Sequence, residues 1–197
     1  MKLRCSFSLL SMWRRGQFDM AVNSYLHREL PMNQAMSEGI MWDQHITEWV
    51  DLYKRLPDEF GGDELLKPKT QEKIIVPYND MCDLVILPDI LDGNMLWENK
   101  TGDSKDSADY AIDFQIAMYF LGCELSGRNI DMALINHYNQ HTNELDRTLV
   151  WKTPQELERG RNFIETLAPE IHNYFSENGI FELDKEAKEA YNSKYDN

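Results

Sequence analysis

Cysteine is scarce in this chain of 197 residues, which contains three: Cys5, Cys82 and Cys123. They are odd in number and far apart, so a disulfide framework is not expected. No Cys-x-x-Cys pair occurs, which excludes a zinc ribbon or a clustered cysteine site of that kind. We therefore expect three reduced, buried thiols.

Long apolar runs are also lacking. No stretch approaches the ~20 consecutive apolar residues that a membrane-spanning helix needs. The first eleven residues contain a short apolar stretch, but Trp13-Arg14-Arg15 follows without a small-residue cleavage site. We therefore expect an intracellular, cytoplasmic protein with no membrane association.

Positive charge is low as well. The chain has 20 lysines and arginines against 34 aspartates and glutamates, which gives a formal net charge of -14. This charge weighs against a simple nucleic-acid binder, because attraction to phosphates drives most nonspecific affinity. A chain of this composition that acts on DNA needs positive charge near its site or on a partner. The candidates for local attraction are Arg14, Arg15, Arg28, Lys67 and Lys69.

The length and the 42% hydrophobic content indicate one packed domain. We expect it to span residues 1–181, with a polar tail at 182–197. The spacing of apolar residues predicts helices over residues 6–30, 37–55, 107–123 and 154–176. The last of these begins at Thr153-Pro154-Gln155-Glu156, a capping-box pattern with proline at the first helical position.

Between these helices, the spacing of apolar residues shortens from the helical period to that of strands. Residues 57–72 contain prolines and glycines and read as a loop. Strands are predicted over residues 73–78, 81–87, 95–100, 130–138 and 148–152. This order predicts an α/β domain with a mixed central sheet flanked by helices. Asp92-Gly93 is a hairpin signal, which we assign to the connection between the strands at 81–87 and 95–100.

Two of these strands contain residues suited to hydrolysis. Asp83 lies on the first, and Glu98 and Lys100 lie on the second. Residues two apart in a strand point to the same face, so Glu98 and Lys100 project together. The expected hairpin would bring Asp83 beside them. The backbone carbonyl of Asn99 lies between the two.

Such a set of groups suits a metal-dependent hydrolase. The carboxylates of Asp83 and Glu98, with the Asn99 carbonyl, supply the oxygen ligands that Mg²⁺ prefers, and Mn²⁺ can substitute. The ion would lower the pKa of a bound water and neutralise charge on a phosphate. Lys100 would orient or deprotonate that water, or stabilise the transition state.

This segment resembles the core of PD-(D/E)XK nucleases, in which an acid precedes an acid-x-lysine motif. Glu98-Asn99-Lys100-Thr101-Gly102 is similar to the Asp-Tyr-Lys-Thr-Gly form of the RecB-like branch. Gln115 and Tyr119, four residues apart on the next predicted helix, match the Gln-x-x-x-Tyr motif of that branch. The resemblance implies a restriction-endonuclease-like fold, and implies that Gln115 and Tyr119 help to order the active site and DNA.

The same branch has an upstream helix in which a glycine precedes a histidine or acid that completes the metal site. Gly39 begins the corresponding stretch here. The usual spacing falls on Asp43, whereas the histidine, His45, comes two residues later. The helical pattern does not choose between them, and we favour His45 because histidine is the RecB-like residue type.

The resemblance also indicates the function. Some relatives hold an iron–sulfur cluster through one early and three late cysteines, but no cysteine follows Cys123 here, so that cluster is not expected. The implied activity is that of a Mg²⁺-dependent DNA exonuclease of phage or mobile-element recombination type, acting with DNA and with a recombination partner or as a homo-oligomer. The alternative is a non-enzymatic nucleic-acid-binding or structural protein that keeps the fold.

Overall fold

The N-terminal residues fold into a strand and two helices. The computed structural model describes residues 1–27, 41, 44–45, 69–101, 113–139, 142 and 144–186. Strand β1 (Leu3–Cys5) leads into α1 (Phe7–Arg14), which Ser6 caps by accepting a hydrogen bond from the Leu9 amide at 3.3 Å. Helix α2 (Phe18–His27) follows. The single helix predicted for residues 6–30 is wrong, because Gly16 at φ 72° separates the two.

The strands form two sheets. In the first, the order is β1-β4-β3, with β3 at Ile74–Pro77 and β4 at Cys82–Ile86. Strand β1 runs parallel to β4, and β3 runs antiparallel to it.

The second sheet has the order β2-β5-β6-β7-β8. Its strands are β2 (Lys69–Thr70), β5 (Ile90–Asp92), β6 (Met95–Thr101), β7 (Met132–Asn139) and β8 (Glu144–Trp151). Strands β6 and β7 are parallel, and the other neighbours are antiparallel. The predicted mixed α/β architecture is confirmed, but its strands are divided between two sheets.

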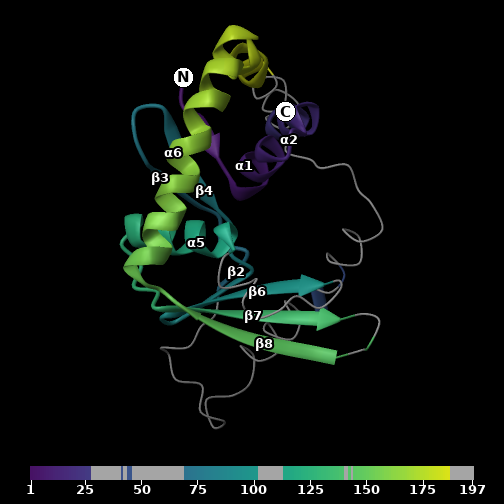
Figure 1. Cartoon of the computed structure of the whole chain (residues 1–197), viewed down its shortest axis with the longest axis vertical. Helices are drawn as coiled ribbons and strands as arrows, with labels where there is room; N and C mark the ends of the chain where they lie inside the picture. Colours follow the sequence, from purple (N-terminus) through teal and green to yellow (C-terminus); the bar gives the residue numbers. More distant parts are fainter. Residues whose placement is uncertain are drawn as a thin grey trace, which may run out of the picture.

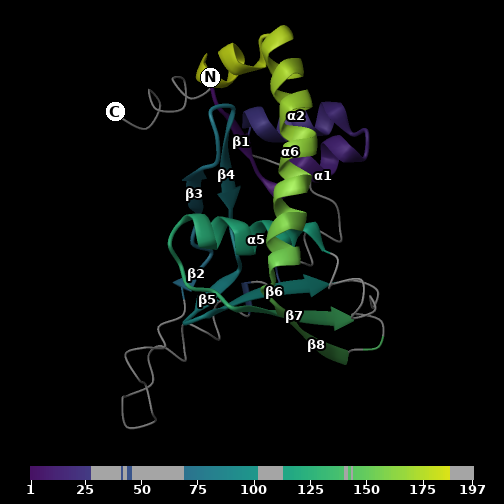
Figure 2. The ribbon, with the colours of Figure 1, turned by 60° about the vertical axis from the view of Figure 1, so that its left-hand side comes forward.

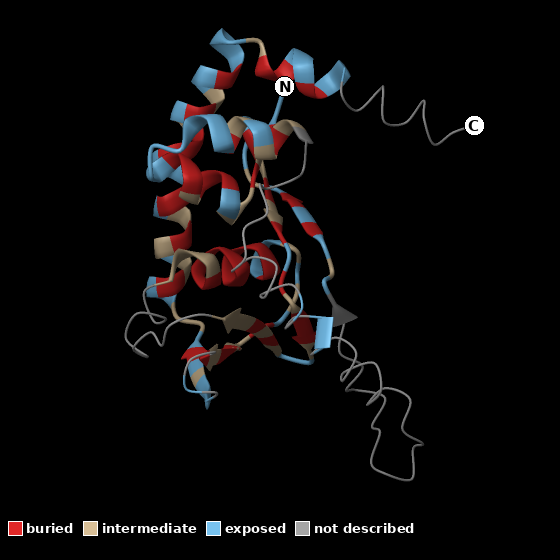
Figure 3. Ribbon diagram, turned by 90° about the vertical axis from the view of Figure 1, so that its right-hand side faces the viewer, coloured by how far each residue is buried: buried red, intermediate tan, exposed pale blue. Residues whose placement is uncertain are grey.

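Two helices pack against these sheets. Helix α5 (Phe114–Leu125) connects the parallel strands β6 and β7, and residues 116–123 along it are buried. Figures 1 and 2 show α5 between the two sheets, with the long helix α6 (Pro154–Glu177) crossing it. A Cβ on Gly160 would lie 2.8 Å from the Ala117 carbonyl oxygen, so glycine permits this close crossing. Figure 3 shows that the buried residues gather on α5 and on the inner faces of the other elements.

The start of α6 confirms the predicted cap. The Thr153 hydroxyl accepts a hydrogen bond from the Glu156 amide at 3.2 Å, and Pro154 is the first helical residue. Beyond α6, residues 180–186 are helical. A polar tail was predicted from residue 182, yet Asp184 is 1% exposed and pairs with Arg4 at 2.7 Å. The helix therefore continues to residue 186, and Asp184 within it is buried in the domain.

The predicted hairpin is wrong. The short strand β5 lies between β4 and β6, and it is β5 that pairs with β6 across Gly93 and Asn94, with Asp92 opposite Met95. Gly93 has φ 57°, as such a tight turn requires. Strand β4 pairs instead with β1 and β3 in the other sheet.

Several predictions lie outside the described residues. These are most of the helix at 37–55, the loop at 57–68 and the start of the helix at 107–123. The three cysteines are free and buried, as expected. Among the described helices, none has the length and apolar character needed to cross a membrane.

Candidate active site

A buried carboxylate forms the centre of the candidate site. Glu98 lies in the middle of β6, opposite Ile135 of the parallel strand β7, and is 4% exposed. Its side chain points to the inner face of the second sheet, toward α5. A charged carboxylate is strongly destabilised by burial unless neighbouring groups compensate for the lost water. Its partners therefore define the site.

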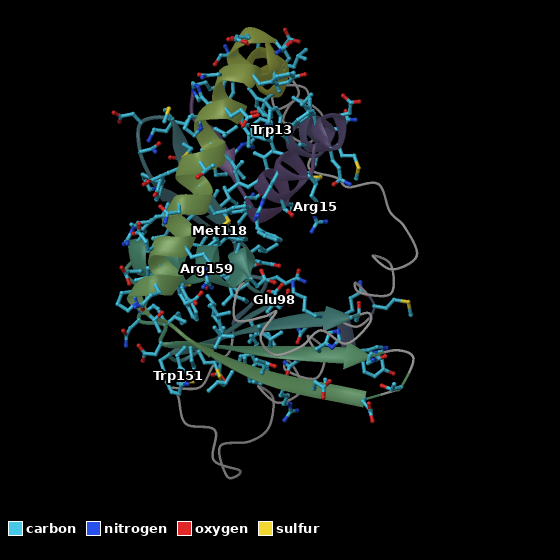
Figure 4. The ribbon with its side chains drawn as sticks, viewed as in Figure 1. Trp13, Arg15, Glu98, Met118, Trp151 and Arg159 are labelled. Carbon is cyan, nitrogen blue, oxygen red and sulfur yellow. The ribbon has the colours of Figure 1, made fainter. Side chains whose placement is uncertain are left out.

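Lys100 and Gln115 are these partners. The Lys100 ammonium lies 2.6 Å from Oε1 of Glu98 and donates a second hydrogen bond to the amide oxygen of Gln115 at 2.7 Å. The amide nitrogen of Gln115 donates to the same Glu98 oxygen at 2.7 Å. Three side chains thus form a closed set of contacts, and the predicted projection of Glu98 and Lys100 to one face is confirmed. Figure 4 labels Glu98 between α5 and β6.

Tyr119 extends this network toward β4. Its hydroxyl accepts a hydrogen bond from the Gln115 amide nitrogen at 2.7 Å and donates one to the Leu87 carbonyl at 3.0 Å. Gln115 and Tyr119 are one helical turn apart on α5. The Asp113 side chain caps this helix by accepting a hydrogen bond from the backbone N–H of Gln115 at 2.7 Å. The cap fixes the start of α5, and with it the position of Gln115.

The electrostatics keep Lys100 charged. Burial lowers the pKa of Lys100, but the charges of Glu98, Asp113 and Asp89 and the hydrogen bond to Glu98 together raise it above its ordinary value. Lys100 is therefore an ammonium at neutral pH. The stability that it contributes is present through neutral pH, and it is lost only as the pH rises through this raised pKa. A protonated lysine suits charge stabilisation better than proton abstraction.

Tyr119 stays neutral for a similar reason. Burial, followed by the charge of Glu98, raises its pKa well above the ordinary value, and the hydrogen bond from Gln115 opposes this only in part. The phenol therefore keeps its proton and can donate to Leu87.

Asp89, which the sequence interpretation passed over, is the second acid of this cluster. In the register of β5 and β6, Ile90 pairs with Trp97, and Asp89 directly precedes β5. Its Oδ2 accepts a hydrogen bond from the Asn99 amide at 2.6 Å. The signal was present in the sequence, because a two-residue turn after Asp92 requires this pairing.

Asp83 lies elsewhere. It is in β4, paired across the first sheet with Arg4 and Pro77, and its carboxylate is 3.4 Å from the Lys2 ammonium. Along β4, Asp83 is four residues before Leu87, the residue that contacts Tyr119. At ~3.3 Å per residue this is about 13 Å. The structure therefore does not bring Asp83 to Glu98 in the way the sequence predicted.

The remaining predicted ligands differ in how well they are placed. The Asn99 backbone adjoins the cluster through its amide, whereas its side-chain oxygen accepts a hydrogen bond from Asn136 at 3.1 Å on the opposite face of the sheet. His45, like Gln44, is helical and exposed, and the alternative, Asp43, lies outside the described residues. Within the described ranges, no group of three or more histidines, cysteines, aspartates or glutamates could hold a metal ion. Carboxylates of Asp89 and Glu98, with the Asn99 carbonyl, remain as candidate ligands.

A cavity of about 350 Å³ adjoins the cluster at Gln115 and Tyr119. Polar and basic side chains make up part of its wall: Arg4, Ser6, Ser8, Ser24, Tyr25 and Lys73. Val85 of β4 and Leu87, which follows β4, line it too, whereas Asp83 does not. A concave site with a few polar groups beside a titratable cluster is the usual form of a substrate site.

The basic residues predicted to attract DNA are partly described. Arg14 and Arg15 are exposed at the end of α1, where Figure 4 labels Arg15. Arg28 and Lys67 lie outside the described residues, and the side chain of Lys69 is not described.

Comparisons with known proteins bear on the fold. No protein-family model matches this chain, and no curated protein matches it in sequence. A phage related exonuclease from Haemophilus somnus is 11% identical over 90% of this chain and 96% of that chain, with a TM-score of 0.50. The two share a fold. An alkaline exonuclease from Laribacter hongkongensis is 14% identical over 90% of this chain and 86% of its own length, with a TM-score of 0.48.

Proposed function

We propose that this chain is a divalent-metal-dependent nuclease of the PD-(D/E)XK type that hydrolyses phosphodiester bonds in DNA. One observation carries the proposal. The buried Glu98 is held by Lys100 and Gln115, and the Asp89 carboxylate, just before β5, accepts a hydrogen bond from the neighbouring Asn99 amide. A buried acid in contact with a charged lysine and a second acid, next to a cavity, is costly as a purely structural device and useful as a catalytic one.

The residues present fit a magnesium ion. Asp89, just before β5, and Glu98 on β6 offer carboxylate oxygens, and Asn99 offers a backbone carbonyl. Mg²⁺ is typically bound by one or two carboxylates and keeps several waters, so this small set is sufficient. His45 stays a prediction as a further ligand. When bound, the ion would supply a water of lowered pKa and neutralise charge on the phosphate.

The protein side chains have separate roles. Lys100 provides a fixed positive charge where the phosphate becomes more negative. Glu98 and Gln115 hold its ammonium from two sides, so little reorganisation is needed during the reaction. Gln115 also fixes the orientation of the Glu98 carboxylate, and Tyr119 fixes Gln115. In this assignment Asp89 takes the place that the sequence alone gave to Asp83.

The mode of cleavage, from DNA ends or within the strand, is proposed from the structural comparison. The solved structure with a TM-score of 0.50 is a phage related exonuclease, so we propose exonuclease action on DNA ends. The net charge of -14 favours a second protein or a homo-oligomer as an aid to DNA binding. The same charge favours the alternative, a binding protein that keeps this fold without turnover.

A cleavage assay decides between these functions. The purified chain is incubated with end-labelled linear DNA and with closed circular DNA, in Mg²⁺, Mn²⁺ or EDTA. We expect metal-dependent degradation of the linear DNA alone, and none by Glu98→Gln. Cleavage of the circle would show endonuclease action. Binding without cleavage in either metal would refute the enzyme and support the alternative.

A further inference from the structure

Arg14 is held by two aromatic rings. Its guanidinium carbon lies 4.8 Å from the centre of the Phe114 ring and 5.9 Å from that of Phe163. These two rings stack on each other, with centroids 4.4 Å apart and planes 20° apart. Phe163 is buried, so the pair is a rigid platform fixed to the core. Arg14 itself is exposed.

Other arginines are neutralised by carboxylates. In the part of the chain that the structure describes, ion pairs with Asp or Glu are formed by Arg4, Arg128, Arg159 and Arg161. Arg14, Arg15 and Arg147 form none with the described residues. Stacking on a ring uses the flat face of the guanidinium. Its N–H donors lie along the edge and remain available for a bidentate anion.

The platform is next to the catalytic cluster. Phe114 lies between Asp113, which raises the pKa of Lys100, and Gln115, which bonds to both Glu98 and Lys100. This surrounding is acidic, with Asp89, Glu98 and Asp113 close together. A DNA strand that approaches it needs an opposing positive charge, and Lys100 is already engaged by Glu98.

We propose that Arg14, stacked on Phe114 and Phe163, is a phosphate-binding residue that holds the DNA backbone at the edge of the catalytic cluster. The inference rests on the proposed function, because it takes DNA as the ligand. Arg14 binds a phosphodiester next to the reacting one and does not take part in bond cleavage. The stacked rings hold its guanidinium in place before DNA arrives, which lowers the entropy lost on binding.

The test measures binding without turnover. A fluorescein-labelled DNA oligonucleotide is titrated by anisotropy in Ca²⁺ over a series of salt concentrations. The variants are Arg14→Gln, Arg14→Lys and the matched control Arg147→Gln. Arg147 is exposed and has no carboxylate partner among the described residues. On β8 it pairs with Asn136 of β7, which pairs with Asn99 of β6, so its side chain lies on the sheet face opposite to that of Glu98. Arg14→Gln and Arg147→Gln change the net charge equally.

We expect Arg14→Gln to weaken binding about tenfold and to reduce the slope of log K against log salt by about 0.7–0.9. Arg14→Lys should keep most of the slope but bind several-fold more weakly, because it lacks the planar fork. Arg147→Gln should stay within about twofold of the wild type. Equal effects of the two glutamine variants, or wild-type affinity of Arg14→Lys, would overturn the proposal.

A double-mutant cycle tests the platform itself. Phe114→Leu keeps an apolar side chain but removes the ring, so it should weaken binding when Arg14 is present and have little effect with Arg14→Gln. Additive losses would overturn the stacking argument, and melting temperatures would show that each variant is folded. The binding assay decides the role of Arg14 whether or not DNA is cleaved. Absence of cleavage by the wild type contradicts only the proposed function.

Discussion

Strands β4 and β6 each carry an acid that the sequence marks as catalytic, but the two acids have different surroundings. The Asp83 side chain on β4 is 29% exposed and lies 3.4 Å from a Lys2 ammonium that is itself 41% exposed. Such a surface pair contributes about 0–1 kcal/mol. The Glu98 side chain on β6 is 5% exposed and contacts Lys100 at 2.6 Å and Gln115 at 2.7 Å.

The difference shows what identifies a site in this molecule. An acid on a strand is common and stable wherever water reaches it. A buried acid needs several converging polar groups, because removing one partner of a buried pair costs about 3–5 kcal/mol. Glu98 has such groups from β6 and from α5, while Asp83 has one flexible partner. Convergence of side chains from different elements is therefore the stronger indication of function.

Removal of Lys100 should have the largest effect. We expect Lys100→Ala to lower DNA cleavage roughly a thousandfold, because it removes the fixed charge that stabilises the transition state. Cleavage of end-labelled linear DNA measures the loss, and circular dichroism checks that the variant is folded at 25 °C. Lys2→Ala is the control, since Lys2 pairs with Asp83 and should be dispensable. A folded Lys100→Ala variant with the wild-type rate would remove Lys100 from the mechanism.

The two aspartates test the comparison directly. Asp89→Asn should lower cleavage by about a hundredfold, because it weakens the second oxygen ligand of the metal. Asp83→Asn should change the rate less than about threefold, since among the described residues its carboxylate forms an ion pair with Lys2 alone. Both rates are measured at saturating Mg²⁺. The opposite ranking would return the catalytic role to Asp83 and refute the assignment of Asp89.

A metal ion bound at Glu98 and Asp89 should stabilise the fold, and Asp83 on β4 should play no part in this stabilisation. With Mn²⁺ at about 100 times its Kd, the gain is about 2.7 kcal/mol, which is a rise in Tm of several degrees. We expect this rise for the wild type and for Asp83→Asn, its loss in Glu98→Gln and Asp89→Asn, and its reversal by EDTA. Differential scanning fluorimetry measures it. An equal rise in all four proteins would place the metal elsewhere.

Tyr119→Phe should give the smallest change. It removes one hydroxyl that accepts from Gln115 and donates to the Leu87 carbonyl. A typical hydrogen bond is worth about 0.5–1.5 kcal/mol, so the rate should fall about twofold to tenfold. The control is Tyr174→Phe, which changes an exposed tyrosine of α6. A loss as large as that of Lys100→Ala would mean that Tyr119 does more than orient Gln115.

Local patterns in the sequence were enough for part of this site. The two-residue period of a strand puts Glu98 and Lys100 on one face, and the helical period puts Gln115 and Tyr119 one turn apart. The capping pattern at Thr153 located the start of α6 correctly. These features depend only on residues within a few positions of one another, so the sequence alone determines them.

The tertiary structure decided which acid meets Glu98. Strand β5 has three residues, too few to show a period, so the turn at Gly93 was assigned to the wrong pair of strands. Strand pairing then fixed the outcome, because β5 pairs with β6 and Asp89, just before β5, contacts the Asn99 amide next to Glu98, while β4 joins another sheet. The contact of Arg14 with Phe114, across a hundred positions, likewise arises only when α1 packs near α5. Such long-range pairings depend on how whole elements bury their apolar faces, which no local pattern encodes.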